Sequence, residues 1–239
     1  MARPTLRLTR PAPKVCGRYG LFAPPEEIAR LFGVAADFEY VPRYNVAPSQ
    51  HALVALAASD GPRLGPLRWG FHVGGLAKGR RQINARSETV HSSPAFRTAF
   101  SRRRCLIPAS GFYEWRPEEG GKVPYWIHSN SNTLFVMAGI WGRDPQLEGS
   151  EERQTGEAGF TILTRSATPT LKTIHDRMPI LLRPDSAALW LDRSASVEVL
   201  RGTLAEAPVE VSAYPVSTVV NSPANDEPEC IQPVGPLLF

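Results

Sequence analysis

The stretch Arg104-Cys-Leu-Ile-Pro-Ala-Ser-Gly-Phe-Tyr-Glu-Trp115 contains two short apolar and aromatic runs separated by small residues. Short runs of this composition bounded by Gly or Pro are typical of β-strands, so we expect strands at 104–108 and 111–115. The same pattern predicts further strands at 52–57, 67–71, 124–128, 134–141, 159–164, 178–182 and 209–214. Sheet therefore dominates the expected fold.

Helical patterns are few and short. Residues 24–32 begin with prolines and acids and end before Gly33, which predicts a helix. Further helices are expected at 94–101, 185–191 and 194–204. The strands do not alternate regularly with these helices, which disfavours a doubly wound parallel sheet. We therefore predict a single α+β domain with a mainly antiparallel sheet and peripheral short helices.

Two segments fall outside this pattern. Residues 1–14 hold four basic residues, three prolines and no acid, and they lack the apolar stretch of a secretory signal. We interpret them as an N-terminal extension, non-native or removed by processing, and place the domain at 15–239. Residues 144–157 are rich in Glu, Gly and Gln, which predicts an exposed loop between two strands.

The charge of the chain is unevenly distributed. The formal net charge of +4 equals the charge of residues 1–14, so the remaining chain is neutral. Within it, residues 78–104 carry eight basic residues against Glu88 alone. Such a segment in a neutral body suits a groove for a polyanion, and the alternative is a solvated surface. No apolar run reaches the roughly 18 residues of a membrane span, so we expect a soluble protein without a membrane partner.

The three cysteines include no Cys-x-x-Cys pair, which fits a reducing, cytoplasmic environment and argues against zinc. Cys105 lies in an apolar run and is interpreted as a core residue, while Cys230 lies in a Pro-rich tail. Cys16 is the candidate for chemistry. The sequence contains no phosphate-loop, zincin or serine-hydrolase motif, and we expect no metal and no cofactor.

Two ionisable residues stand out. Glu114 alternates with aromatic residues in an expected strand, so an inward carboxylate there would have a raised pKa and could act as an acid or base. The alternative is a solvent-facing strand glutamate. His175, followed by Asp176 and Arg177, could carry protons or act as an electrostatic clamp. The alternative for His175 is a capping or turn residue.

Several motifs follow one another along the chain. They are Val15-Cys-Gly-Arg-Tyr19, Arg43-Tyr-Asn-Val-Ala-Pro48, Leu67-Arg-Trp-Gly-Phe71, Ile83-Asn-Ala-Arg-Ser-Glu88, Ile107-Pro-Ala-Ser-Gly-Phe-Tyr-Glu-Trp115, Phe135-Val-Met-Ala-Gly-Ile-Trp141, Thr173-Ile-His-Asp-Arg-Met-Pro179 and Pro215-Val-Ser-Thr-Val-Val-Asn221. With these motifs, residues 15 to about 235 resemble the SOS response-associated peptidase (SRAP) family. The resemblance implies that family's fold, with a barrel-like core.

The resemblance also implies a sensor of abasic sites in single-stranded DNA, acting in the DNA damage response. In the family, a cysteine that becomes the mature N-terminus links covalently to the ring-opened sugar. The matching residue is Cys16. A terminal cysteine offers an amine with a pKa near ~8 and a thiol near ~8.5 on adjacent carbons. The amine forms a Schiff base, which the thiol closes to a thiazolidine, and the same imine implies some lyase activity.

The sequence departs from the family at one point, because the nitrogen of Cys16 is tied up in a peptide bond to Val15. One account is a misassigned start: a GTG codon encodes Val internally but Met when it initiates, so the chain would begin at residue 15. The other account is self-cleavage between Val15 and Cys16, as the family's peptidase name suggests.

Residue roles follow from the resemblance, position by position. Asn84 would orient the amine or the sugar, Glu114 would shuttle protons, and His175 would assist opening of the sugar ring. The implied DNA contacts are Arg18, Arg86, Arg177, Thr164 and the stacking candidates Trp69, Trp115 and Pro48. For Trp69 the alternative is core packing.

Two other functions stay open. The first is a thiol peptidase that acts on protein, with Cys16, His175 and Asn84 as nucleophile, base and orienting residue. The second is a noncovalent single-strand binding module, which would bind intact and abasic strands equally. For the abasic-site function we expect a monomer, with abasic single-stranded DNA as its partner and the nucleoid as its location when bound.

Overall fold

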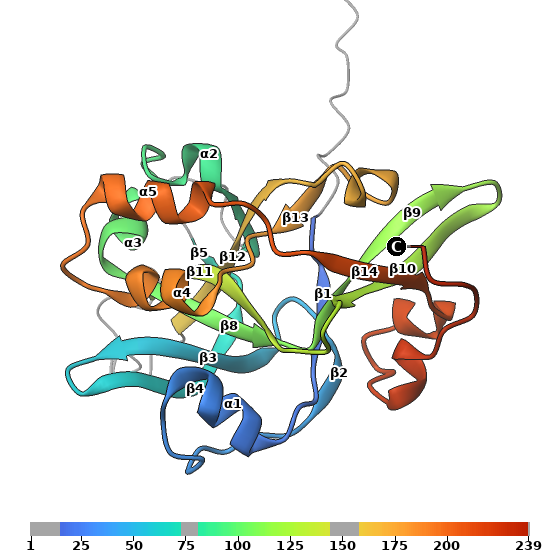
Figure 1. Ribbon diagram of the computed structural model, residues 1–239, viewed down its shortest axis with the longest axis horizontal. Coiled ribbons are helices and arrows are strands. Elements are labelled where there is room, and N and C mark those ends of the chain that lie inside the picture. The colour runs from blue at the N-terminus through green and yellow to red at the C-terminus, as the bar shows by residue number, and fades with distance from the viewer. Residues whose placement is uncertain (1–14, 73–80, 144–157, 239) are drawn as a thin grey trace, which may run out of the picture.

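The computed structural model describes residues 15–72, 81–143 and 158–238 of the chain and contains two principal β-sheets (Figure 1). The smaller sheet has five strands, all paired antiparallel, in the order β14-β10-β9-β1-β2. Their bounds are Arg18–Leu21 for β1, Arg43–Val46 for β2, Gly111–Glu118 for β9, Gly121–Ser129 for β10 and Val211–Pro215 for β14. This sheet carries the beginning of the described chain at an inner position.

The larger sheet has seven strands in the order β11-β8-β3-β4-β12-β13, with β7 also paired to β12. Because β11 pairs with both β8 and β12, the sheet has the barrel-like curvature expected from the sequence. The bounds are His51–Ala58 for β3, Gly61–Trp69 for β4, Asn84–Arg86 for β7, Arg104–Ala109 for β8, Phe135–Arg143 for β11, Ala158–Ser166 for β12 and Arg177–Pro179 for β13. A small third sheet pairs β5 (Phe71–His72) with β6 (Arg81–Gln82).

Short helices lie at the periphery, as predicted (Figure 1). They are α1 (Pro25–Phe32), α2 (Ser87–Val90), α3 (Arg97–Arg102), α4 (Pro184–Leu191) and α5 (Val197–Ala205), with 3-10 turns η3 (Leu171–Thr173), η4 (Thr218–Asn221) and η5 (Pro228–Ile231). The predicted mainly antiparallel α+β architecture is confirmed, with parallel pairing only where β12 meets β4 and β7 among the described strands. The expected loop at 144–157 and the extension at 1–14 lie outside the described residues.

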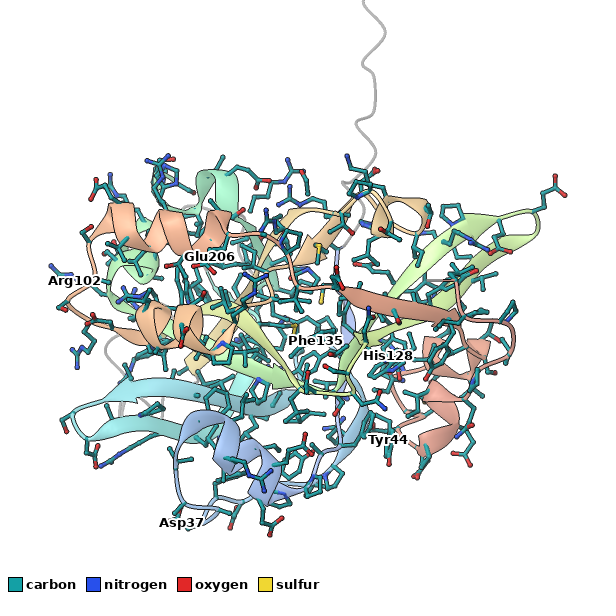
Figure 2. The ribbon with its side chains drawn as sticks, viewed as in Figure 1. Asp37, Tyr44, Arg102, His128, Phe135 and Glu206 are labelled. Carbon is teal, nitrogen blue, oxygen red and sulfur yellow. The ribbon has the colours of Figure 1, made fainter. Side chains whose placement is uncertain are left out.

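Aromatic side chains join the two sheets. The rings of Tyr19 and Trp69 meet edge to face at 5.2 Å, and Phe112 packs against Phe135 at 6.2 Å. Phe135, labelled in Figure 2, lies near the centre of the molecule and is almost fully buried. These contacts fix the smaller sheet, which holds Cys16 and Glu114, against the larger sheet, which holds Asn84.

The register of β1 against β9 brings the start of the domain to the middle of β9. Arg18 lies opposite Tyr113 and Gly20 opposite Gly111. The residues just before β1 therefore run alongside Glu114. Parallel pairing with β12 positions β7, and its first residue, Asn84, reaches the carbonyl oxygen of Val15 just before β1.

Candidate functional site

Cys16 is fully buried at the entrance to β1. Its backbone nitrogen donates a hydrogen bond of 2.6 Å to Glu114 Oε1. Its φ of 42° is in the left-handed region, which a non-glycine residue enters only at a cost of about 1–3 kcal/mol. Burial, and then the nearby Glu114 carboxyl, raise the pKa of the thiol well above its usual range, so the sulfur is held as a neutral thiol.

Glu114 points inward from β9 and is 3% exposed, so the solvent-facing alternative is wrong. Burial raises the pKa of its carboxyl to about 8, although the hydrogen bond from the Cys16 nitrogen and the charge of Lys122 both oppose this rise. A carboxyl with a pKa near neutrality can both give and take a proton under ordinary conditions. Of the two orientations that the sequence left open for Glu114, the structure has the inward one.

Asn84, at the start of β7, contacts the residue before Cys16. Its Nδ2 donates a hydrogen bond to the carbonyl oxygen of Val15. Its Oδ1 is buried and has no hydrogen-bond partner among the residues that the structure describes. Glu114 and Asn84 thus hold the two sides of the Val15–Cys16 peptide bond, one at the nitrogen and the other at the oxygen.

A cavity of about 850 Å³ opens beside this cluster. The residues that line it come from the start of β1, the β9–β10 hairpin, the segment around η3 and the end of η4. They are Gly17, Arg18, Pro48, Glu114, Trp115, Arg116, Pro117, Lys122, Lys172, Thr173, Ile174, His175, Asp176 and Asn221. Four of these side chains are basic, and the carboxyl of Glu114 has a raised pKa, so the cavity favours an anionic ligand.

His175 lines the cavity at the start of the segment leading into β13. Its ring is half-buried, and its Nδ1 accepts a hydrogen bond of 3.1 Å from the backbone nitrogen of Arg177. Burial lowers the pKa of the imidazole, which keeps the ring neutral near pH 7. His175 thus makes the local contact expected of a turn residue, and it also lines the same cavity as Glu114. Within the described parts of the chain, no hydrogen bond joins it to Cys16, as a thiol peptidase would need.

Arg18 and Trp115 are held at the cavity by the C-terminal part of the chain. The Arg18 guanidinium donates to Asn45 Oδ1 at 2.9 Å and to the carbonyl oxygens of Val220 and Asn221 at 2.7 and 3.0 Å. Trp115 Nε1 donates to Asn221 Oδ1 at 2.8 Å. The Arg18 charge is therefore fixed in place by neutral acceptors and stays available to an anion.

Arg177 and Arg86 lie on the neighbouring surface. Arg177 forms a bidentate ion pair with Glu88, at 2.8 and 2.9 Å, and also donates to the carbonyl oxygen of Thr164 at 2.7 Å. This pairing lowers the pKa of the Glu88 carboxyl, chiefly through the Arg177 hydrogen bonds. Arg86 is exposed at the end of β7. Neither arginine lines the cavity.

Two of the predicted DNA contacts are core residues in the structure. Trp69 is fully buried, packs on Tyr19 and Phe160, and donates from Nε1 to the carbonyl oxygen of Ile83. Thr164 is 2% exposed within β12. The core-packing alternative describes Trp69, whereas Trp115 and Pro48 do line the cavity.

Four polar residues at or behind the site were not predicted from the sequence. Lys122 and Lys172 line the cavity, and Asn45 and Asn221 position Arg18 and Trp115. Asn45 and Asn221 belong to motifs that the sequence analysis singled out without assigning a role. Among the described residues, no group of three or more His, Cys, Asp or Glu side chains is placed to hold a metal ion, and no helix is long and apolar enough to cross a membrane.

A buried cysteine and glutamate, together with a partly buried asparagine, lie beside a cavity with four basic side chains, which is a site suited to an anionic ligand. Residues 15–223 match the family described as SOS response associated peptidase (SRAP), which covers most of the chain. The protein belongs to the SRAP family.

Characterised relatives extend over nearly the whole chain. The abasic site processing protein YoqW of Bacillus subtilis is 36% identical over 91% of this chain and 99% of its own. YedK of Escherichia coli, which carries the same description, is 32% identical over 92% and 100%. HMCES of Gallus gallus, also so described, is 33% identical over 82% of this chain and 67% of its own.

Solved structures share the fold. A protein from Bacteroides thetaiotaomicron superposes with a TM-score of 0.75 at 24% identity, covering 92% of this chain and 100% of its own. A phage-related protein from Bordetella bronchiseptica gives a TM-score of 0.69 at 30% identity, covering 85% and 95%.

Proposed function

We propose that the protein senses abasic sites in single-stranded DNA and captures the opened sugar through Cys16 once its nitrogen is free. The observation that carries this proposal is the 2.6 Å contact between the Cys16 nitrogen and a buried Glu114 carboxyl beside a basic cavity. The description of three relatives as abasic site processing proteins supports the substrate. The covalent link would shield the lesion from strand breakage in the DNA damage response.

The proposed chemistry uses both polar atoms of one residue. The amine of Cys16 adds to the sugar aldehyde, and loss of water leaves an imine with a new carbon–nitrogen bond. The thiol then adds to the imine carbon, and its proton passes to the nitrogen, which closes the thiazolidine. Glu114, with a pKa of about 8, can supply the proton for water loss and take the proton from sulfur.

Asn84 and His175 have supporting roles in this proposal. The unpartnered Oδ1 of Asn84 is an acceptor for a free amine at Cys16 and would hold it in place. His175, neutral because burial lowers its pKa, would take the proton of the sugar hydroxyl as the ring opens. If the thiol step fails, the same imine permits β-elimination, so some lyase activity is proposed.

DNA binding is proposed for the groups that reach the cavity. Arg18 would bind a phosphate, and Trp115 with Pro48 would stack on a neighbouring base, a contact worth roughly 1–3 kcal/mol per base. Arg86 and Arg177 would meet the strand beyond the cavity. We leave Trp69 and Thr164 out of the proposed interface because both are buried in the core. We also propose that the protein is a monomer in the cytoplasm and lies on the nucleoid when it is bound to DNA.

Self-cleavage before Cys16 is a second candidate activity, and the contacts at Val15 favour it. The Cys16 thiol would give its proton to the Glu114 carboxylate and attack the Val15 carbonyl carbon, while Asn84 Nδ2 stabilises the oxyanion. Glu114 then passes that proton to the nitrogen as the carbon–nitrogen bond breaks, which leaves a thioester that water hydrolyses to a carboxylic acid and the thiol. The products are residues 1–15 with a carboxyl end and a free thiol and amine at Cys16. The left-handed φ of Cys16 destabilises the starting peptide.

A denaturing gel tests the main proposal. Protein of known intact mass is incubated with single-stranded DNA that is either intact or has one excised uracil. We expect a denaturation-resistant adduct with the abasic strand only. Cys16→Ala and Cys16→Ser should both abolish it because neither has a thiol, and a variant chain whose residue-16 amine is free should give only an imine that borohydride reduction is needed to trap. Cys230→Ala, which removes another buried cysteine, is the matched control and should keep the adduct.

The outcomes separate the rival functions. An undiminished adduct with Cys16→Ala refutes the assignment. Turnover of added peptides without an adduct indicates a thiol peptidase, and equal, salt-dependent binding of both strands without an adduct indicates a binding module. The intact mass over time tests self-cleavage: appearance of a chain beginning at Cys16 in purified protein supports it, and an unchanged full-length mass refutes it.

A further inference from the structure

Two lysines of the cavity have no assigned partner. Lys122 lies near the start of β10 and Lys172 in η3, so they come from different walls of the cavity. Both side chains are exposed. Neither forms a hydrogen bond or ion pair with any other residue in the described parts of the chain.

The two arginines that line the cavity, unlike these lysines, are held by contacts with other residues. Arg116 is paired with Glu118 at 2.5 Å and lies over the Tyr125 ring at 4.6 Å. Arg18 donates to carbonyl and amide oxygens. The acids that line the cavity are Glu114, which is protonated over part of the neutral range, and Asp176. Lys122 and Lys172 are therefore the basic groups of the cavity whose ammonium groups no described residue holds in place by a hydrogen bond or ion pair.

Lys122 also lies close to the chemistry. Its charge lowers the pKa of the Glu114 carboxyl, although burial dominates there, and it adds to the lowering of the His175 pKa by burial. A ligand group that binds Lys122 is therefore next to the sugar when the sugar aldehyde reaches Cys16. The nearest anionic groups on an abasic nucleotide are the phosphodiesters on its two sides.

We propose that Lys122 and Lys172 bind the two phosphodiester groups that flank the abasic sugar, one from each wall of the cavity. This inference rests on the proposed function, and it specifies which groups of the DNA the site binds. Lysine suits the task because a phosphate approached from changing directions is met by a flexible point charge rather than by a rigid fork. The pair would hold the sugar between them while Cys16 reacts.

Binding to a stable abasic analogue tests the proposal without depending on the covalent step. The probe is a fluorescent single-stranded oligonucleotide with one tetrahydrofuran site, flanked either by natural phosphodiesters or by neutral methylphosphonates. Anisotropy titrations over a range of KCl concentrations compare the wild-type chain with Lys122→Gln and Lys172→Gln. Arg30→Gln is the matched control, because it removes an exposed positive charge from α1, away from the cavity.

For the natural probe, we expect each lysine variant to bind about threefold to tenfold more weakly, with a salt slope shallower by about 0.7. The methylphosphonate probe should remove this difference, and Arg30→Gln should bind like the wild type. Wild-type affinity in both lysine variants, or an equal loss with both probes, overturns the proposal.

The covalent gel assay separates this inference from the proposed function. If the lysine effects hold but the aldehyde-bearing strand gives no adduct, the phosphate contacts stand and the thiazolidine function fails. If the adduct forms but the lysine variants bind both probes like the wild type, the function stands and the phosphate contacts fail. A wild-type chain that binds neither probe refutes both.

Discussion

At the scale of single residues, Glu114 links the reaction to the stability of the fold. Its carboxyl has a pKa of about 8 in the folded chain, against an ordinary value of 4.5, because burial disfavours the charged form. Between these values the folded chain binds more protons than the unfolded chain. The free energy of unfolding therefore falls as the pH rises from about 4.5 to about 8. The contribution of protonated Glu114 to stability is fully present only below this range.

Glu114→Gln tests this coupling. The amide has nearly the same shape and does not titrate, so the variant should lose the part of the pH dependence, a few kcal/mol, that comes from this group. Urea unfolding at pH values of about 5.5 and about 8 measures it. The same variant should form the DNA adduct roughly 10- to 100-fold more slowly, because the proton shuttle is gone. An unchanged pH dependence of stability would contradict the assigned pKa.

Residue positions were predictable where a strand pattern alternates. The aromatic neighbours of Glu114 narrowed its carboxylate to an inward or a solvent-facing orientation, and the structure shows the inward one. The burial of Trp69 was not predictable, since its motif fits a surface platform as well as a core residue. Lys122 and Lys172 carry no local signal, because their importance comes from two distant segments meeting at one cavity.

At the scale of elements, the pairing of β9 with β10 depends on the close approach at Gly111. A Cβ there would lie 2.5 Å from the carbonyl oxygen of Ile127 and would also clash with the Trp126 ring. Backbone on one side and a buried indole on the other leave little room to adjust. This approach fixes the strand that carries Glu114.

Gly111→Ala should therefore destabilise the fold by about 2–4 kcal/mol, because the added methyl overpacks a rigid site. Thermal or urea unfolding measures the loss. Gly202→Ala is the control: a Cβ at Gly202 in α5 meets no heavy atom within 4 Å, and alanine favours a helix, so its stability should be unchanged or higher. A small effect at Gly111 would show that Trp126 can move aside.

The bounds of an element were predicted within a few residues where residues in the sequence mark its ends. Elements without such end signals were not predicted. Helix α1 was expected at 24–32 and spans Pro25–Phe32, since proline, acids and a terminal glycine mark its ends. The motif around Asn84 gave no such signal. Its strand β7 has three residues and its helix α2 has four, so both owe their form to packing against β12.

At the scale of the whole molecule, one carboxylate adds to the contacts by which Arg18 and Trp115 hold the C-terminal segment behind the site. Asp226 Oδ1 accepts hydrogen bonds from the backbone nitrogens of Tyr44 and Asn45 at 2.6 and 2.7 Å, and its other oxygen pairs with Arg43. The same segment supplies two of the three acceptors of Arg18, the carbonyl oxygens of Val220 and Asn221. Tyr44 lies beside this segment in Figure 2.

Asp226→Ala should loosen the C-terminal segment, because it leaves two backbone donors and one arginine without their acceptor. We expect a loss of roughly 2–4 kcal/mol and faster hydrogen exchange over residues 216–234. Binding of abasic DNA should weaken as well, since Arg18 and Trp115 lose their fixed acceptors. Asp37→Ala, at an exposed acid labelled in Figure 2, should change neither. Unaltered exchange would show that other contacts hold the segment.

The burial of Cys16 also has a consequence for chemical durability. Peroxide and other oxidants attack the thiolate, and they need access to it. The Cys16 sulfur is fully buried and is held as a protonated thiol, so it offers oxidants neither access nor a thiolate. Under the proposed function, the protein would keep the Cys16 sulfur intact during oxidative stress, when removal of damaged bases creates abasic sites.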